Sequence, residues 1–309
     1  MKYTEWRTGV ADENAAVEIA KSLSISSLAA RVLVARGIDT SDGAADFLSR
    51  DIRKLLSPML MCDMDRVLSR INRALEANEK IAVYGDYDAD GITACYIMYE
   101  YLKSRGADCI YYIPDRMDEG YGVNEGAVDV LAKSGVTLII TVDTGITAVC
   151  EVENAAARGV DFIITDHHEC RETLPGAVAV INPHRADCDY PFKSLAGVGV
   201  AFKLICALEG RILTKYIPFV CIGTVADIMP LIGENRAIVA LGLEMINNCD
   251  NLGLTKLLAS AGVINKTIDS NTIGFALAPR INAAGRMSSA MRVVELFMEE
   301  DGERAHYEA

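Results

Sequence analysis

The sequence contains no Cys-x-x-Cys pair, although nine cysteines are spread along its 309 residues. This spacing excludes a zinc knuckle and a disulfide framework, and it predicts reduced thiols in the core. The sequence also has no apolar stretch long enough to cross a bilayer, and residues 1–7 lack the basic-then-apolar order of a secretory signal. We therefore expect a cytoplasmic protein that does not bind membranes.

Positively charged residues are scarce. Lysine and arginine number 30 against 43 aspartates and glutamates, which gives a net charge of −13. This balance is unusual for a protein that binds nucleic acid, because phosphate contacts need basic side chains. Two explanations remain: the acids gather at a metal site, or the basic surface belongs to a part of the protein outside this chain. The second agrees with residues 299–309, which show no helix stop signal and suggest a chain cut within a structural element.

The pattern of apolar residues predicts two regions. Residues 1–70 show helical periodicity without a strong strand, and no chemistry is visible there. Residues 71–309 are expected to form one domain, in which short apolar runs alternate with helical segments and a helical extension follows residue 182. Such continuous runs predict a parallel sheet buried on both faces. The expected fold is therefore α/β, with a doubly wound five-stranded parallel sheet whose strands are residues 81–84, 109–113, 138–142, 162–165 and 177–181.

Acidic residues and histidines follow the predicted strands where those strands end. They come from the first, third and fourth strands and are, in chain order, Asp86, Asp88, Asp90, Asp143, Asp166, His167 and His168. Because the ligands of doubly wound sheets bind beyond the carboxyl ends of the strands, we expect these side chains to meet at one edge. Oxygen and imidazole ligands without thiolates favour Mn²⁺ or Mg²⁺, and two such ions together promote hydrolysis of a phosphodiester. Asp227 joins this set, because a lone carboxylate in its apolar helical stretch is costly to bury without a cation.

The spacing of Asp86, Asp88 and Asp90 also resembles the start of a calcium-binding loop between two helices. Position twelve of such a loop is a bidentate glutamate, whereas here it is Ile97, and the motif follows a strand. A plain turn of solvated acids is a second alternative, but it does not account for the acids that follow the other strands. The two-ion site is therefore the favoured prediction.

The two adjacent histidines are predicted to have separate roles. Neighbouring residues that leave a strand point in different directions. We assign His167 to the metal ions and His168 to the substrate phosphate, as an acid or hydrogen-bond donor. Asp166 is predicted either to take part in catalysis or to orient one of the imidazole rings.

Two further segments are suited to binding anions. Arg280, Asn282 and Arg286 stand among small residues in a predicted loop from Pro279 to Met287, which suits the close approach of a phosphate backbone. A salt-bridged loop is the alternative. The glycine turn at residues 197–199 precedes a predicted helix, where it either offers amide groups to an anion or serves as a tight packing turn.

The ordered set of motifs resembles the RecJ family of the DHH phosphoesterase superfamily, in the N-terminal half of its members. Asp-His-His at residues 166–168 marks only the superfamily, whereas the order of the other segments points to this family. Those segments are residues 26–39, Tyr84-Gly-Asp-Tyr-Asp-Ala-Asp-Gly, residues 112–122, Thr141-Val-Asp-Thr-Gly, Ile164-Thr-Asp-His-His-Glu, Ile181-Asn-Pro-His, Gly223-Thr-Val-Ala-Asp and Pro279-Arg-Ile-Asn-Ala-Ala-Gly-Arg.

The resemblance implies a processive exonuclease, specific for single-stranded DNA, that digests from 5′ to 3′ and releases 5′-mononucleotides in DNA repair and recombination. It implies substrate contacts by His168 and, along the DNA path, by Arg280, Asn282 and Arg286. Single-strand-binding protein and a RecQ-type helicase are further candidate partners. The metal ligands it implies are Asp88, Asp90, Asp143, His167 and Asp227, with Asp86 close by.

The chain also departs from this family in two respects. Many superfamily members place a histidine ligand at the position of Tyr84, so Asp86 or water is expected to replace that ligand. The C-terminal DHHA1 domain and the oligonucleotide-binding (OB-fold) domain of the family are absent from these 309 residues, which would leave the cleft open on one side.

Two other functions agree with the same pattern. A sibling phosphoesterase acting on oligoribonucleotides, cyclic dinucleotides or pyrophosphate would share the metal site, but the N-terminal helical segment and the segment at 279–287 favour the exonuclease. A non-catalytic scaffold with a DHH fold is the third function considered. Such relatives lose ligand residues, whereas the acids and both histidines are present here.

Overall fold

The computed structural model describes residues 12–116, 119–287 and 290–308. The segment at 1–7 that lacks a signal pattern, and Met117 and Asp118 of the 112–122 motif, lie outside the described residues. The chain forms two compact units, one that ends at Asp51 and one that begins at Ile52.

The first unit is helical, as predicted for this region. Each of its helices begins after a polar side chain that accepts hydrogen bonds from free amide groups of the first turn, namely Asp12, Ser26 and Thr40. Small and branched apolar side chains form the core between the helices. These helices are α1 (Glu13–Leu23), α2 (Ser27–Ala35) and α3 (Ser41–Leu48).

The boundary between the units differs from the expected one at residue 70. Helix α4 (Met64–Glu76) belongs to the second unit, because its apolar face packs against α8 (Gly197–Glu209) and β5 (Ala179–Ile181). Helical periodicity alone does not show which core a helix joins.

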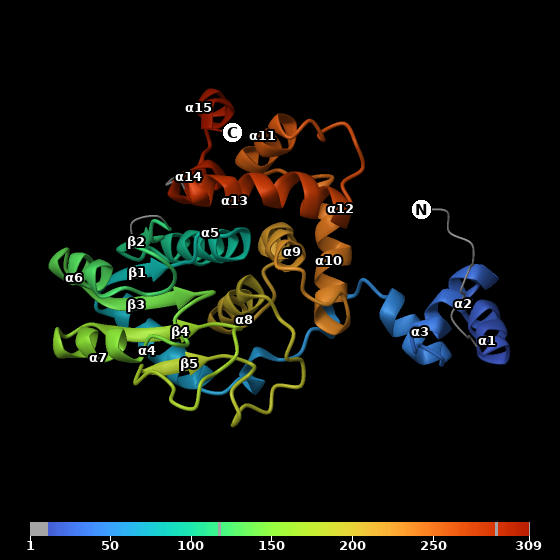
Figure 1. The fold of residues 1–309 in the computed structure, drawn as a ribbon, viewed down its shortest axis with the longest axis horizontal. Coiled ribbons are helices and arrows are strands. Elements are labelled where there is room, and N and C mark those ends of the chain that lie inside the picture. The colour runs from blue at the N-terminus through green and yellow to red at the C-terminus, as the bar shows by residue number, and fades with distance from the viewer. Residues whose placement is uncertain (1–11, 117–118, 288–289, 309) are drawn as a thin grey trace, which may run out of the picture. The chain divides into compact units, whose positions relative to one another are not determined.

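The second unit is built on a parallel five-stranded sheet (Figure 1). The strands lie in the order β2–β1–β3–β4–β5, and every neighbouring pair is parallel. The predicted strands are confirmed, each to within a few residues of its expected range. Together with β5 they are β1 (Lys80–Tyr84), β2 (Cys109–Tyr112), β3 (Val136–Val142) and β4 (Asp161–Thr165).

Helices cover both faces of this sheet, which confirms the doubly wound α/β fold. Ile81 and Val83 enter one core with α4, α5 (Ala89–Ser104) and α8. Ala82 and Tyr84 enter a second core with α6 (Glu125–Lys133) and α7 (Val149–Ala157) on the opposite face. Successive strand residues point to opposite faces, so a strand buried on both sides is apolar at every position.

The chain after the sheet is helical, as expected, and α8, α9 and α14 pack against α5. None of the described helices is long and apolar enough to span a membrane. After α8 the elements are η3 (Thr214–Tyr216), α9 (Ile217–Ala226), α10 (Gly233–Ile246), α11 (Leu252–Ser260), α12 (Ser270–Thr272), the π-helix η4 (Ile273–Leu277), α13 (Ala278–Arg286), α14 (Ala290–Met298) and α15 (Gly302–Glu308).

The prediction of a loop from Pro279 to Met287 was wrong, because most of this segment forms α13. Helix α13 directly follows the π-helix η4, so the helical run from Ser270 to Arg286 continues through Pro279, with a π-helical turn just before it. The alanines that follow favour helix formation.

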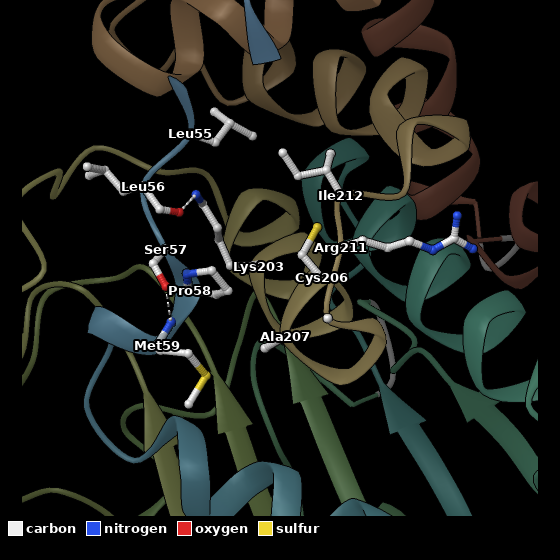
Figure 2. A pocket seen from close by; sticks show the side chains of 11 residues that line it. Leu55, Leu56, Ser57, Pro58, Met59, Lys203, Cys206, Ala207, Arg211 and Ile212 are labelled. Atoms are coloured by element: carbon white, nitrogen blue, oxygen red, sulfur yellow. Dashed lines mark hydrogen bonds between the residues drawn. The ribbon is translucent and has the colours of Figure 1, made fainter. Parts of the chain in front are cut away.

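A strap of residues 52–60 crosses α8 before α4 begins. It contains the short 3₁₀ turns η1 (Ile52–Lys54) and η2 (Pro58–Leu60). The buried Lys203 of α8 donates a hydrogen bond of 2.7 Å to the carbonyl of Leu56 in the strap, as Figure 2 shows. A cavity of about 400 Å³ lies between the strap and the C-terminal end of α8. The strap thus fixes the helix whose N-terminus contributes to the site described next.

Candidate metal centre

The strand order places most of the predicted ligands at the switch point of the sheet. In the order 2-1-3-4-5 the winding reverses between β1 and β3, which leaves a crevice beyond the carboxyl ends of these strands. The segment after β1 carries Asp86 and Asp88, β3 leads into Asp143, and β4 leads into Asp166 and His167. All of these except Asp88 are almost fully buried.

Asp88 caps the first turn of α5. Its Oδ1 accepts hydrogen bonds from the amides of Asp90 at 2.9 Å and Gly91 at 3.0 Å. Gly91 allows the turn to close, since a Cβ atom on it would lie 2.6 Å from the carbonyl oxygen of Asp86. This cap holds a carboxylate oxygen of Asp88 within 4.8 Å of those of Asp86 and Asp143.

The carboxylate of Asp90 is bound at the N-terminus of α8. The amide of Gly197 donates to Oδ2 at 2.7 Å and the amide of Val198 donates to Oδ1 at 2.9 Å. The free amide groups of a helix N-terminus favour a negative charge. Of the two expectations for this glycine turn, the structure shows the anion site, and the anion is a side chain of the protein itself. A Cβ atom on Gly223 would lie 2.7 Å from Oδ1 of Asp90, so a second glycine also makes room for this carboxylate.

Asp143 has a strained backbone and an unpaired carboxylate oxygen. Its φ of 60° lies in the left-handed region, which few residues other than glycine adopt. Its Oδ1 is buried without a hydrogen-bond partner, although Nε2 of His167 lies only 3.1 Å away. A buried acceptor without a donor is costly. A bound cation would remove that cost, so the unpaired oxygen of Asp143 fits a metal site.

His167 lies among three of the acids. Its Nε2 is 3.1 Å from Asp143, 3.7 Å from Asp227 and 3.9 Å from Asp90, measured to the nearest carboxylate oxygens. Burial and the positive charge of His168 lower the pKa of His167 to about 4. The ring is therefore neutral at neutral pH, with a nitrogen lone pair available to a metal.

Asp227 enters the cluster from the C-terminal end of α9. The next residue, Ile228, has a φ of 58°, although branched side chains rarely adopt positive values and this one is 88% exposed. Packing of the Ile228 side chain does not offset the strain of this turn. The turn instead directs Asp227 back towards the sheet, which agrees with the location of backbone strain at functional sites.

The carboxyl groups of the cluster are hard to ionise without a cation. Burial, with the nearby charge of Asp88, raises the pKa of Asp86 to about 7 and that of Asp227 to about 6. Burial and neighbouring aspartates also raise the pKa values of Asp90 and Asp143 well above their usual range. Bound divalent cations relieve this repulsion.

The ligand atoms gather into groups whose members lie within 4.8 Å of one another. Two of these groups share no residue, and their carboxylates and imidazole suit a pair of ions such as Mn²⁺ or Mg²⁺. A third group joins Asp143 and His167 to His168 and so overlaps the other two. The two separate groups are Asp90 with His167 and Asp227, and Asp86 with Asp88 and Asp143.

Asp166 orients His168. Its Oδ1 accepts a hydrogen bond from Nδ1 of His168 at 2.7 Å and from the amide of His167 at 2.7 Å, while its Oδ2 accepts from the amide of Ile146 at 2.9 Å. Burial opposes the charge of Asp166, but the hydrogen bonds outweigh burial and lower its pKa. The same contact raises the pKa of His168 to about 9, so the ring is protonated at neutral pH. The His168 side chain is 43% exposed and remains open to a substrate.

The three predicted substrate-binding residues lie on α13. Asn282 is not free, because its Oδ1 accepts a hydrogen bond of 2.7 Å from the amide of Ala89 and so anchors α13 at the start of α5. Arg280 and Arg286 are exposed. The positive charge of Arg286 lies near enough to act on the pKa of Tyr87, in the direction that lowers it. Tyr87 stands between the proposed ligands Asp86 and Asp88 in the sequence. The structure therefore brings α13 beside the acidic cluster.

Tyr121 and Tyr87 also lie beside the cluster, and the sequence analysis did not single them out. The hydroxyl of Tyr121 is 3.3 Å from Nε2 of His168, and its ring meets that of Tyr87 edge-on with 6.2 Å between centroids. The guanidinium of Arg116 lies 5.2 Å from the centre of the Tyr87 ring. Tyr121 is 58% exposed and lies between two glycines with positive φ. The Gly-Tyr-Gly sequence was the signal from which an exposed tyrosine in a turn could have been predicted.

Asn182 is a further residue that the sequence analysis missed. Its Nδ2 donates a hydrogen bond of 2.9 Å to the carbonyl of His168. It belongs to the Ile-Asn-Pro-His motif, so the motif was visible in the sequence although its contact was not.

Tyr84 points away from the cluster. Its hydroxyl donates to the carbonyl of Gly122 at 3.1 Å and accepts from Nδ2 of Asn124 at 3.2 Å, in the core on the opposite face of the sheet. The carboxylate that joins Asp88 and Asp143 comes instead from Asp86.

Comparison with known proteins agrees with this architecture. Residues 80–224 match the family described as the DHH family, N-terminal domain. The chain is 44% identical over 296 residues to the single-stranded-DNA-specific exonuclease RecJ of Bacillus subtilis (strain 168), which covers 96% of this chain and 38% of that protein. The structure of RecJ from Thermus thermophilus in complex with Mn²⁺ aligns with a TM-score of 0.81 at 30% identity, over 97% of this chain and 43% of that one.

A second RecJ crystal structure, bound to manganese, aligns with a TM-score of 0.75 at 34% identity, over 82% of this chain and 65% of that one. The chain thus spans less than half the length of the Bacillus and Thermus proteins. Both matches nevertheless extend over nearly all of this chain's own length. Residues 80–224 therefore match the DHH N-terminal domain, and the chain as a whole is similar to RecJ exonucleases.

Proposed function

We propose that this chain is the metal-binding part of an exonuclease that digests single-stranded DNA from its 5′ end and releases 5′-mononucleotides, in DNA repair and recombination. The observation that carries the proposal is the buried Oδ1 of Asp143, which has no hydrogen-bond partner and lies 3.1 Å from a neutral His167. The substrate class is supported by the relatives, which are single-stranded-DNA-specific exonucleases.

Two divalent ions fit the separate ligand groups. Asp90, His167 and Asp227 would hold one ion, and the group of Asp86, Asp88 and Asp143 would hold the other. Solved RecJ structures contain Mn²⁺ or Mg²⁺, so we propose these ions here. When bound, such ions polarise the phosphate and lower the pKa of water.

His168 acts on the substrate phosphate in this proposal. Asp166 holds Nδ1 of the ring, so the protonated Nε2 is directed away from the buried carboxylate and donates a hydrogen bond to a phosphate oxygen. Water adds to phosphorus, the bond to the 3′ oxygen of the terminal nucleotide breaks, and that oxygen takes up a proton. Asp166 stays ionised throughout, as a positioning residue.

Aromatic and basic side chains near the cluster support a single-stranded substrate. An unpaired base offers a ring face for stacking, and Tyr121 is exposed next to His168. Arg116 and Arg286 bring positive charge near Tyr87, and Arg280 is exposed on the same helix as Arg286, although the chain as a whole carries a net charge of −13. Two bound divalent ions offset part of this negative charge where the phosphates would lie.

The test is digestion of 5′-labelled single-stranded DNA by the purified chain in Mn²⁺, beside a matched duplex and a short oligoribonucleotide. We expect labelled mononucleotide from the DNA single strand alone, and none from an Asp143→Asn variant. Preferential cleavage of the oligoribonucleotide would instead favour the sibling phosphoesterase. A chain that binds Mn²⁺ and cleaves none of the substrates would show that the metal-binding part needs the rest of the protein for digestion.

The remaining proposals concern the whole protein. We place it in the cytoplasm, with single-strand-binding protein and a RecQ-type helicase as partners. For the part of the relatives' length that this chain does not span, we propose a DHHA1 domain and an OB-fold domain. Faster digestion of DNA coated with single-strand-binding protein, compared with DNA coated by an unrelated protein, would support that partner.

A further inference from the structure

The first turn of α10 carries a buried asparagine that the proposed chemistry does not use. Asn235 is fully buried, and its Nδ2 donates to the carbonyl of Ser194 at 2.5 Å and to that of Pro230 at 3.1 Å. Ser194 lies just before α8, and Pro230 lies in the turn between α9 and α10. One amide group therefore joins two segments that are distant in the sequence.

Both joined segments hold metal ligands. After Ser194, the backbone of Leu195 lies next to the ring of His167 and acts to raise its pKa. The amides at the start of α8 bind Asp90. Pro230 closes the strained turn that begins at Asp227. The two segments that Asn235 joins therefore lie next to Asp90, His167 and Asp227, which form one complete ligand group.

The other ligand group is held by different contacts. Asp88 is fixed by the first turn of α5, and Asn282 anchors that turn to α13. Asp86 precedes the same turn, and Asp143 follows directly from β3. None of these hydrogen bonds involves Asn235, although Gly197 at the start of α8 also lies against the carboxylate of Asp143.

The neighbouring Glu234 fixes Asn235 in place. One oxygen of Glu234 accepts from the amide of Leu56 at 2.8 Å and from the ammonium of Lys203, and the other accepts from the hydroxyl of Tyr190 at 2.5 Å. Lys203 also reaches the carbonyl of Leu56, which Figure 2 shows. The first turn of α10 is thus joined to α8 and to the strap, which gives Asn235 a rigid support.

The amide oxygen of Asn235 is buried and has no hydrogen-bond partner among the described residues. An unpaired buried acceptor is destabilising, so the contribution of this side chain comes from the hydrogen bonds that its Nδ2 donates. From these contacts we propose that Asn235 is a positioning residue. It sets the affinity of the ion bound by Asp90, His167 and Asp227 and leaves the other ion unaffected. This inference rests on the proposed two-ion function.

The test is a titration of metal-free protein with Mn²⁺. Binding is measured by calorimetry and by the electron paramagnetic resonance signal of free Mn²⁺. The wild-type chain is expected to bind two ions. In Asn235→Ala one site should weaken by about 10–100-fold, the range seen when a partner of a metal ligand is lost, and the other should keep its affinity. Asn235→Asp has nearly the same volume but no N–H donors, and we expect it to lose the same site.

Asn247→Ala is the matched control. Its Nδ2 also bridges two backbone carbonyls, those of Leu243 at 2.7 Å and Ile268 at 3.1 Å, but neither segment holds a proposed metal ligand. If loss of such a bridge only lowered stability, Asn247→Ala would show the same effect as Asn235→Ala. If Asn235 positions the ligands, Asn247→Ala should not lose one ion selectively. Both ion affinities are therefore expected to stay at the wild-type value.

Each result separates the inference from the function beneath it. Fewer than two ions on the wild-type chain would overturn the two-ion function. Two ions on the wild type, with both affinities unchanged or both equally weakened in a folded Asn235 variant, would overturn the positioning role alone. If circular dichroism shows that Asn235→Ala is unfolded, the same titration on Asn235→Ser decides, because serine keeps one donor.

Discussion

Nδ1 of His168 lies 2.7 Å from Oδ1 of Asp166, and this contact joins a partly exposed ring to a fully buried carboxylate. The two groups shift each other in opposite directions. The pKa of His168 rises to about 9, while that of Asp166 falls despite its burial. The charge of the ring at neutral pH thus depends on a residue that the substrate does not reach.

Replacement of Asp166 by asparagine should shift the alkaline limb of the pH profile. Without the carboxylate the pKa of His168 falls from about 9 towards its ordinary value of 6.5. We expect the alkaline limb of kcat/KM to move down by about one to two pH units. An NMR titration of His168 in the metal-free protein checks the cause directly. Glu169→Gln is the control, since Glu169 contacts His184. An unmoved alkaline limb in Asp166→Asn would refute the proposed role.

Asp143→Asn is expected to stabilise the metal-free protein while destroying one ion site. The amide removes a buried charge, can donate to Nε2 of His167, and tolerates the left-handed backbone. We expect a gain of about 1 kcal/mol or more in thermal unfolding with a chelator present. Mn²⁺ affinity at that site should fall by more than about 100-fold, beyond the loss of a mere ligand partner. A destabilised variant with intact Mn²⁺ binding would show that Asp143 is structural.

A single methyl group at Gly197 should prevent ion binding. The Cβ atom of Gly197→Ala would overlap the carboxylate of Asp143 and displace it. Gly199→Ala in the same helix is the matched control, because its Cβ atom would meet only the Leu195 side chain at 3.4 Å. Calorimetric Mn²⁺ titration should show loss of at least one site in the first variant and none in the second. Equal behaviour of the two variants would count against the close approach of α8 to the acids.

The metal-free protein should become less stable as pH rises from about 5 to about 8. Asp86 and Asp227 have folded-state pKa values raised to about 7 and about 6, so folding holds protons that the unfolded chain has released. Their stabilising contribution is lost as pH rises through these values, and that of His168 is lost as pH rises towards about 9. His167, lowered to about 4, acts in the opposite sense but is a single group. Thermal unfolding with a chelator measures the trend, and saturating Mn²⁺ should reverse it.

Arg280→Ala and Arg286→Ala should each weaken binding of single-stranded DNA equally for all sequences. Each lost phosphate contact should reduce the slope of log affinity against log salt by about 0.7. Fluorescence anisotropy with labelled oligonucleotides at several salt concentrations measures this slope. Arg211→Ala serves as the control, since Arg211 is exposed at the cavity beside the strap. An unchanged slope in both variants would remove α13 from the DNA path.

The sheet was predictable from the sequence for a physical reason. Strands buried on both faces are apolar at every position, so Ile81–Tyr84 and Leu138–Val142 stand out from their surroundings. The carboxyl ends of parallel strands meet at one edge, so the acids that follow them could be grouped before any coordinates were known.

Contacts between distant segments were not predictable in this way. The sequence shows a glycine at 197, but not that Asp90 would be the anion at its amide. Nothing in the sequence around Asn235 indicates that its side chain joins two backbone carbonyls. Helix α13 was missed because a proline among polar residues resembles a loop until the helical run that continues through it is known. These features arise from tertiary packing, which local composition does not encode.

The location of Asp227 on α9 also has a consequence for synthesis of the chain. The DHH-family match ends at residue 224, so Asp227, the last of the proposed ligands, lies beyond the matched segment. As the chain leaves the ribosome, the sheet and the acids after β1, β3 and β4 emerge well before α9 can pack against α5. Contacts between segments so far apart in the chain form slowly. A nascent chain therefore cannot complete both proposed metal sites until the helical extension has been synthesised and has packed against α5.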